Sequence, residues 1–345
     1  MVSGCEMIVS PITYEPSPTK VRYDLSYGYS VNCSGTGRYQ INYGCNTPEV
    51  LNGSVTYDIL FPQDYTMVTL VNNTFVQWNV SGDHSELLTL GITAHVTAES
   101  VLLTDLSGQS AASIQELQTR YSSVVNQYTR LQGNETVRYI DPNNPEIIDI
   151  ATSVQRTVHT NNSLLVAKAL FAWLKEHIQY QTHPNETGVR PAAETLTKQN
   201  GDCDDLSFLY VSLCRVVHIP ARFIRGYLVI QDNNGDYAAT AHAWAEVFVG
   251  NNLGENGWIS VECACNAQSI DSNIHQNFGV ENAQHLRLFI DDGTNTSLEF
   301  SLLGISYTYS MNRIIQVYSF AELKSYQQLE SKKLVITPES TRYYE

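Results

Sequence analysis

The sequence predicts an α+β protein in which an all-β region precedes a mixed region of helices and strands. Between 21 and 106, short segments rich in Tyr, Val, Thr and Ile are separated by Gly and Asn turn signals, which is typical of a β-sandwich. Between 114 and 217, apolar residues recur at helical spacing. From 241 to 263, small apolar and larger residues alternate with a period of two, which is typical of strands.

These two regions are joined and flanked by segments of different composition. The first 20 residues are rich in Pro, Ser and Thr, which is typical of a flexible tether. Apolar residues at helical spacing from Ile114 to Leu131 predict a helix that links the two regions. The predicted divisions are a tether (1–20), a β-sandwich domain (21–106), a helical linker (107–150), a second domain (151–310) and a C-terminal extension (311–345).

Individual elements follow from periodicity and from turn signals. We expect strands where branched and aromatic residues are interspersed with polar ones, and helices where apolar residues recur every three or four positions. The predicted strands are 22–31, 55–61, 67–71, 75–80, 87–96, 99–103, 241–249, 258–263, 286–290, 298–303 and 305–309. Beyond the linker, the predicted helices are 146–157, 163–178, 203–217 and 320–330.

The charge balance limits the choice of partners. The chain has 35 acidic and 20 basic residues and a net charge of −15. Nucleic-acid-binding domains carry basic patches, so this balance argues against a nucleic-acid partner. No stretch of about 20 apolar residues occurs, and no membrane-spanning helix is predicted. We expect no cofactor, and nothing in the sequence indicates the oligomeric state.

Two signals favour an extracellular or cell-surface location. The run Val2–Cys5 resembles the end of a lipoprotein signal, with a lipid anchor on Cys5; the alternative is a flexible terminus with an incidental cysteine. Among the seven cysteines, Cys33 and Cys45 flank a Gly-rich loop and are a candidate disulfide pair. Glycosylation sequons are the second signal, and they begin at Asn32, Asn52, Asn72, Asn79, Asn134, Asn161, Asn185 and Asn295.

Cys203 lies at the predicted start of a largely buried helix that must end before Pro220. The positive end of the helix dipole favours a thiolate in this position. Asp202, Asp204 and Asp205 act in the opposite sense, because nearby negative charges disfavour another one. A neighbouring cation, most commonly a histidine, would then decide the state of the thiol. The alternative interpretation is a packed core cysteine.

His242 lies on the predicted strand 241–249, and Glu262 lies on the next predicted strand. The turn residues from Asn251 to Gly257 join these strands into a hairpin, which would bring Glu262 close to His242. An imidazole that acts on a thiol needs such a carboxylate to fix its tautomer and its orientation. Cysteine, histidine and carboxylate therefore have the pattern of a thiol nucleophile, its base and the group that orients the base.

Several short motifs surround these three residues. In chain order they are Ala193–Leu196, Gly201–Asp205, Ile219–Arg222, Gly226–Tyr227, His242–Glu246 and Gly257–Glu262. Motifs of this kind in this order resemble the transglutaminase-like superfamily of cysteine enzymes, which has a papain-like core, in its prokaryotic type with an N-terminal β domain. The resemblance covers roughly 150–290 and implies that the helix bearing the cysteine packs on an antiparallel sheet.

The resemblance implies a catalytic triad of Cys203, His242 and Glu262 that acts on amide bonds of peptides or proteins through a thioester. The backbone N–H of Cys203 is one expected donor to the oxyanion. Candidates for the second donor are Tyr180, Gln199 and Asn200, among which the sequence does not decide. We expect Trp244, Glu246 and Asp205 to support the site without taking part in the chemistry.

One departure from the family pattern concerns the carboxylate. The family usually has Asp where this chain has Glu262, and Cys263–Cys265 replaces the usual Pro-Thr. Hydrolysis is the expected reaction, because water needs no second binding site. The alternatives are transfer to an amine, as in protein cross-linking, and an inactive surface module that only binds. A metal site built from Cys203, His242, Cys263 and Cys265 is disfavoured, because Cys-x-Cys is poor spacing for zinc.

Overall fold

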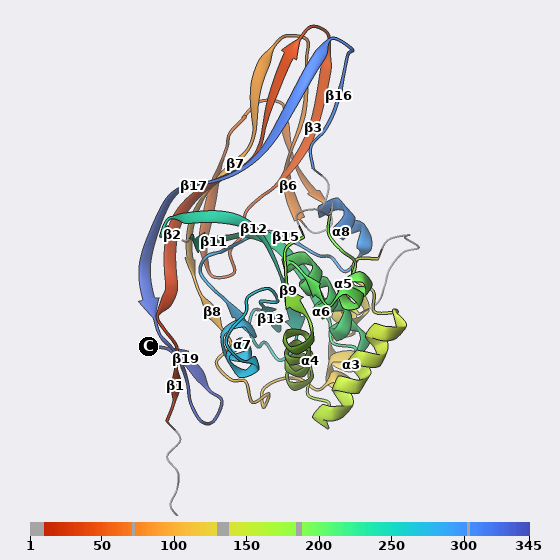
Figure 1. The fold of residues 1–345 in the computed structure, drawn as a ribbon, viewed down its shortest axis with the longest axis vertical. Helices are drawn as coiled ribbons and strands as arrows, with labels where there is room; N and C mark the ends of the chain where they lie inside the picture. Colours follow the sequence, from red (N-terminus) through yellow and green to blue (C-terminus); the bar gives the residue numbers. More distant parts are fainter. Residues whose placement is uncertain (1–9, 71–72, 130–137, 184–187, 233, 302–303) are drawn as a thin grey trace, which may run out of the picture.

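The computed structural model describes residues 10–70, 73–129, 138–183, 188–232, 234–301 and 304–345. Its architecture confirms the predicted α+β fold class. In Figure 1 a β-sandwich forms the upper part of the molecule, and the longer helices gather around a second sheet in the lower part. Cys5 and the sequons at Asn72, Asn134 and Asn185 lie outside the described residues.

Two four-stranded antiparallel sheets form the sandwich in the described residues. Their inner faces share an apolar core that contains Leu25, Trp78 and Ile92. Side chains alternate between this core and the surface, as the strand periodicity predicted. In spatial order, the strands of the first sheet are β17 (Arg313–Lys332), β2 (Ser17–Gly35), β7 (Glu86–Glu99) and β4 (Gly53–Ile59). The strands of the second sheet are β16 (Ser306–Tyr309), β3 (Tyr39–Asn46), β6 (Asn73–Gly82) and β5 (Tyr65–Leu70).

The segment 320–330, predicted as a helix, is instead part of β17. This strand pairs with β2 along nearly its whole length, from Arg313 opposite Gly35 to Lys332 opposite Ser17. Apolar side chains such as Leu323 and Tyr326 pack against the sandwich core. The helical prediction was wrong because pairing with a strand some 300 residues away in sequence overrides a weak local helix preference.

The lower part is built on an antiparallel sheet with the spatial order β13 (Trp258–Val261), β12 (Tyr237–Phe248), β11 (Ala221–Gln231) and β15 (His285–Ile290). Helix α6 (Cys203–Val216) packs against β11 and β12, with the rings of Phe208 and Phe223 4.6 Å apart. The surrounding helices are α3 (Pro145–Val158), α4 (Ser163–His177), α5 (Ala192–Lys198) and α7 (Ile270–Asn277).

Two further groups of short strands connect distant parts of the chain. A small antiparallel sheet near the C-terminus consists of β1 (Ile12–Thr13), β18 (Leu334–Ile336) and β19 (Arg342–Tyr344). β8 (Val101–Leu102) pairs with β14 (Val280–Glu281) and thereby joins the end of the sandwich segment to the lower part.

The long strands of the sandwich also pack against the lower sheet. Figure 1 shows β2 and β17 running down one side of the molecule, where β11 and β12 reach them. The Tyr27 and Tyr227 rings lie 5.5 Å apart, and Tyr237 stacks on Tyr326 at 3.8 Å. The far ends of β11 and β12 therefore belong to the sandwich core, whereas their other ends pack on α6.

Three other expectations differ from the structure. The linker helix consists of α1 (Ile114–Arg120) and α2 (Ser122–Tyr128), separated at Tyr121, whose φ of −124° is not helical. The predicted strand 298–303 overlaps α8 (Asn295–Ser301). The sequon at Asn295 is buried, and its side chain accepts a hydrogen bond from the Tyr139 N–H, so the folded chain cannot carry a glycan there.

Cys33 and Cys45 are both buried and free, so the proposed disulfide is absent. They lie on strands of different sheets that meet at the turn around Gly37. Cys45 is about four residues farther from this turn than Cys33, an offset of roughly 13 Å along the strands. Cysteines can be bridged only when their Cα atoms lie within about 7 Å.

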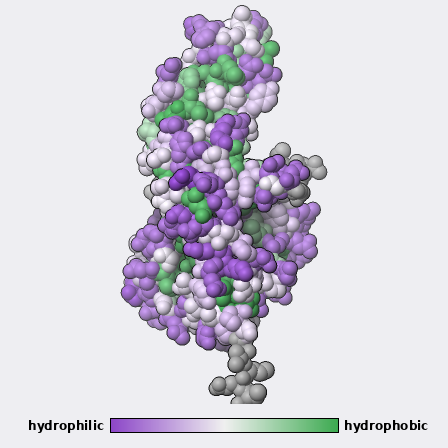
Figure 2. All heavy atoms as spheres, turned by 90° about the vertical axis from the view of Figure 1, so that its left-hand side faces the viewer, coloured by the Kyte–Doolittle hydropathy of each residue, from purple (hydrophilic) through white to green (hydrophobic). Residues whose placement is uncertain are grey.

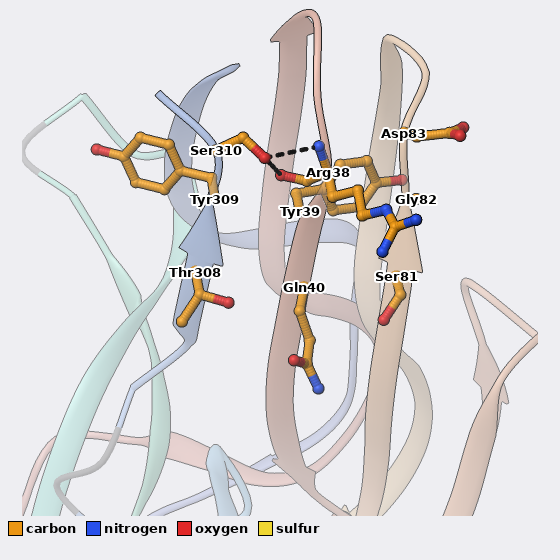
Figure 3. A pocket seen from close by; sticks show the side chains of 9 residues that line it. All are labelled: Arg38, Tyr39, Gln40, Ser81, Gly82, Asp83, Thr308, Tyr309 and Ser310. Carbon is orange, nitrogen blue, oxygen red and sulfur yellow. Dashed lines mark hydrogen bonds between the residues drawn. The ribbon is translucent and has the colours of Figure 1, made fainter. Parts of the chain in front are cut away.

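The surface of the sandwich has two noteworthy features. Figure 2 shows apolar residues on the upper part of the face that carries β17, and Leu87, Ile314 and Tyr318 are among the exposed large apolar residues of this sheet. A hollow of about 720 Å³ lies between β16, β3 and β6. Figure 3 shows its polar lining, in which the Ser310 hydroxyl forms hydrogen bonds with the Arg38 backbone. Cys203, His242 and Glu262 do not line this hollow.

Among the described residues, we find no helix with the length and apolar character needed to cross a bilayer.

Gly28 should be indispensable for the close pairing of β2 with β7. Its φ is +146°, and a Cβ atom would lie 2.1 Å from the Leu90 carbonyl oxygen. Gly28→Ala should therefore lower the free energy of unfolding by about 1–3 kcal/mol or more. Gly235→Ala is the matched control, because Gly235 also has a positive φ, but the nearest atom to a Cβ there would be Gln231 Nε2 at 3.7 Å, an uncrowded distance. Equal losses in chemical denaturation of the two variants would contradict a role for crowding at Gly28.

Candidate active site

Cys203 is the first residue of α6, as the sequence predicted. Asp202 caps the helix by accepting a hydrogen bond from the Asp205 N–H, and the Asp205 carboxylate accepts one from the Asp202 N–H. This reciprocal capping fixes the start of the helix at the cysteine. The free N–H groups of the first turn and the helix dipole then point toward the thiol.

His242 and Glu262 meet at the end of the predicted hairpin. β12 and β13 pair from Phe248 opposite Trp258 to Ala245 opposite Val261, so Glu262 follows the last paired residue. His242 Nε2 lies 2.7 Å from Glu262 Oε2, and both side chains are buried. With Nε2 engaged by the carboxylate, Nδ1 is the nitrogen left to act on the thiol.

The longer side chain of Glu262 is accommodated without loss of hydrogen bonds. Oε2 faces His242, and Oε1 accepts a hydrogen bond from the Ala264 N–H at 2.9 Å. The Glu262 N–H donates to the Asn277 carbonyl at 2.8 Å and thus anchors the backbone that carries the carboxylate. The replacement of the usual Asp by Glu therefore leaves a carboxylate with both oxygens hydrogen-bonded next to the imidazole.

The three groups influence one another electrostatically. Burial alone would lower the pKa of His242, but the Glu262 carboxylate and the Cys203 side chain raise it to about 10. Burial alone would raise the pKa of Glu262, yet His242 holds it well below its usual range. Burial raises the pKa of Cys203, while the neighbouring His242 acts to lower it. Histidine thus acts as the cation that the helix-start cysteine needs.

The aspartates next to Cys203 have cationic or donor partners. Asp204 forms an ion pair with Arg225 at 2.6 Å. Asp205 accepts hydrogen bonds from the Arg190 N–H at 2.8 Å and from His183 at 2.7 Å. Asp205 therefore supports the site as expected, because it holds the helix start against the segment that precedes α5. These partners offset part of the negative charge that would oppose a thiolate.

Among the three candidates for the second oxyanion donor, Tyr180 has a side chain whose pKa is affected by Cys203. β9 (Gln179–Tyr180) pairs in parallel with β10 (Asn200–Gly201), directly before α6. Tyr180 is 41% exposed, but partial desolvation and the charge of Cys203 raise its pKa to about 12, so the phenol stays protonated and can donate. The Asn200 side chain is bonded to Arg190 and to the Lys198 carbonyl instead.

Gln199 is exposed and ends α5 with a left-handed backbone, at φ +55°. Its carbonyl accepts the Gln179 N–H at 3.0 Å, so Gln199 holds β9 beside the start of α6. This backbone role helps to place Tyr180 and requires no particular side chain at 199.

Trp244 and Glu246 belong to a buried polar network on the face of β12 that carries His242. The Trp244 indole N–H donates to Glu281 at 3.0 Å. Glu246 forms ion pairs with Arg222 and Arg287, each at 2.6 Å. Burial alone would raise the pKa of Glu246, but the two arginines lower it to about 2. Glu246 is thus committed to these arginines and does not replace Glu262 beside the imidazole.

Sequence reasoning missed His285 at the start of β15. Its Nε2 lies 3.2 Å from Glu262 Oε2, the same oxygen that contacts His242. The only local signal was a histidine directly before an apolar strand, which does not reveal its neighbours. Nitrogen and oxygen atoms of His242, Glu262 and His285 lie within 4.8 Å of one another and could hold a metal ion. In the described part of the chain, Cys263 and Cys265 belong to no such group.

Residues 149–263 match the family model of the transglutaminase-like superfamily, which confirms the resemblance found in the sequence motifs. Among curated proteins, none matches the chain in sequence.

Solved structures similar to the chain include the following three. A proposed cysteine protease from Cytophaga hutchinsonii is 14% identical, with a TM-score of 0.50 over 92% of this chain and 93% of that chain. The periplasmic domain of TgpA from Pseudomonas aeruginosa is 14% identical, with a TM-score of 0.32 over 70% of this chain and 94% of that domain. Red sea bream transglutaminase is 10% identical, with a TM-score of 0.31 over 70% of this chain and 48% of that chain.

Cys203 should be the most reactive thiol of the folded protein, because His242 can take its proton. Iodoacetamide labelling near neutral pH, mapped by peptide mass, measures this. Cys265 is the matched internal control: it is exposed, but the surrounding protein and Glu262 raise its pKa. His242→Gln should slow the labelling of Cys203 to the rate of Cys265 or below. Faster labelling of Cys265 than of Cys203 in the unmodified sequence would show that the nucleophile is assigned wrongly.

Proposed function

We propose that the protein hydrolyses amide bonds of peptides or proteins through a Cys203 thioester. Members of the transglutaminase-like superfamily are typically cysteine-dependent enzymes, and their fold supports thiol-dependent acyl transfer in general. The observation that carries the proposal for this chain is the buried 2.7 Å contact of His242 with Glu262, beside a cysteine at a helix start. This is the arrangement that activates a thiol nucleophile.

In the first half of the reaction, the proton shared by Cys203 and His242 is held on the imidazole, in keeping with the raised pKa of His242, and the thiolate sulfur attacks the carbonyl carbon. Glu262 stabilises the imidazolium that forms. In this proposal the Cys203 N–H and the Tyr180 hydroxyl donate hydrogen bonds to the oxyanion of the tetrahedral intermediate. When this intermediate collapses, the C–N bond breaks, and His242 returns the proton to the departing amine. A thioester on Cys203 remains.

In the second half, water attacks the thioester carbonyl while His242 accepts a proton from it. The C–S bond breaks, the carboxylic acid leaves, and the proton on His242 restores the thiol. Hydrolysis is favoured over transfer to an amine because it needs no binding site for a second substrate. A protease is also the function proposed for the Cytophaga hutchinsonii protein that shares the fold.

A screen of peptides and proteins that contain glutamine tests the reaction class. Ammonia release, peptide cleavage and incorporation of a primary amine are measured in parallel, with Cys203→Ala as the inactive control. Cleavage or ammonia release without amine incorporation is the expected result. Preferential amine incorporation would replace hydrolysis by transglutamination. No turnover in any assay, together with an unreactive Cys203 in folded protein, would refute an enzymatic function.

Glu262 and Glu246 should differ sharply in their effect on turnover. Glu262→Gln removes the charge that stabilises the imidazolium and should lower kcat by about 10³–10⁴-fold. Glu246→Gln breaks a buried ion-pair network, so its main effect should be on stability, with a smaller loss of kcat. Initial rates and denaturation curves of both variants distinguish these outcomes. A larger kcat loss for Glu246→Gln than for Glu262→Gln would contradict the assignment of the orienting carboxylate.

A further inference from the structure

His285 makes a contact at the candidate site that the proposed mechanism does not use. Its Nε2 lies 3.2 Å from Glu262 Oε2, and its side chain is 3% exposed. The ring packs edge-on against Trp244 with centroids 4.6 Å apart, and its centroid lies 5.6 Å from that of His242. Two buried histidines from different strands therefore converge on a single carboxylate oxygen.

The other ring nitrogen of His285 shows which way its hydrogen bonds run. Nδ1 lies 2.9 Å from the Asn282 side-chain oxygen and 3.3 Å from the Asn282 backbone oxygen. A backbone oxygen can only accept, so Nδ1 is a donor. Nε2 faces the carboxylate of Glu262, which also only accepts when it is ionised. The contact with Glu262 is therefore attractive only if Nε2 carries a proton as well.

The extra methylene of Glu262 explains why a second donor is needed. A glutamate has one more rotatable bond than the aspartate that is usual at this position, and more rotamer freedom must be removed to hold its carboxylate still. The Ala264 N–H fixes Oε1, and His242 alone would leave Oε2 dependent on the catalytic imidazole itself. His285 is a donor to Oε2 that does not move protons in the reaction.

We propose that His285 is a positioning residue that locks the Glu262 carboxylate in the orientation that serves His242. This inference rests on the proposed thiol mechanism. Asn282 and Trp244 hold the His285 ring, His285 holds Glu262, and Glu262 holds His242. The carboxylate is thereby oriented from β15 as well as from the β12–β13 hairpin.

Two substitutions separate hydrogen bonding from bulk. His285→Gln keeps an N–H donor at about the position of Nε2, whereas His285→Leu removes it but keeps an apolar side chain of similar size. In the leucine variant, kcat should fall on the order of 10–100-fold with KM unchanged, as for other groups that orient a catalytic ligand. In the glutamine variant, kcat should stay within a few-fold of the original. A merely structural role would not produce this difference in kcat between two equally folded variants.

The rate of Cys203 alkylation by iodoacetamide provides a second measurement that needs no substrate. It should fall in His285→Leu and recover in His285→Gln. If the unmodified protein turns over no substrate, the proposed function fails, while this comparison still tests His285. Should His285→Leu not fold, Asn282→Ala loosens the same ring without touching Glu262, and it should slow alkylation in the same direction.

Three results would overturn the inference. One is equal kcat and equal alkylation rates in His285→Leu and the unmodified protein. Another is an equal loss in His285→Gln and His285→Leu, which would show that a hydrogen-bond donor at this position is not sufficient. The third is a stoichiometric divalent metal, measured by elemental analysis, whose removal by a chelator reproduces the leucine phenotype. Nε2 of His285 would then be a metal ligand and not a donor to Glu262.

Discussion

The buried carboxylate of Glu262 is the interaction on which the arrangement of the candidate site depends. It receives hydrogen bonds or close nitrogen contacts from His242 on β12, from His285 on β15 and from the Ala264 N–H just after β13. An ionised carboxylate is costly to bury unless its oxygens are satisfied and its charge is balanced. Three strands of one sheet must therefore be in register before this group can be accommodated, which couples the site to the integrity of the sheet.

The β-sandwich also packs against this sheet and stabilises it. β2, β7 and β17 extend past the second sheet of the sandwich, and their lower parts share a core with the far ends of β11 and β12. Stacking of Tyr237 on Tyr326 joins β12 directly to β17. Because β12 also carries His242, the position of the imidazole depends on packing at both ends of one strand. The sandwich thus contributes to the rigidity of the site without supplying any of its three proposed catalytic groups.

Charge compensation is a recurrent feature around the thiol. The aspartates at the start of α6 would oppose a thiolate, but Arg225 pairs with Asp204, and His183 and the Arg190 backbone bind Asp205. Glu246 on β12 and Glu281 on β14 both form ion pairs with the buried Arg287, and Glu246 also pairs with Arg222. Although the chain has an acidic net charge, the carboxylates near Cys203 and His242 therefore have positively charged or hydrogen-bond-donating partners. This leaves His242 and Glu262 as the pair that sets the state of Cys203.

Local patterns in the sequence were sufficient to predict those parts of the structure that depend on residues close together in the chain. The helix start at Cys203, the strand that carries His242 and the hairpin that brings Glu262 to it follow from capping, periodicity and turn signals, all of which act within about 20 residues. The resemblance of 149–263 to the transglutaminase-like superfamily was found from such local motifs, and the fold class was predicted from periodicity and turn signals.

Only the tertiary structure decided what depends on residues that are far apart in the chain. The pairing of β17 with β2, the pairing of β9 with β10 before the start of α6 and the contact of His285 with Glu262 join segments separated by about 20 to 300 residues. Helical preference in 320–330 yielded to strand pairing because a long ladder of backbone hydrogen bonds and the buried side chains outweigh local propensities of a few tenths of a kcal/mol per residue. His285 has no local signature at all, since its role arises from the register of β15 against β11 and from the shape of the space beside Trp244.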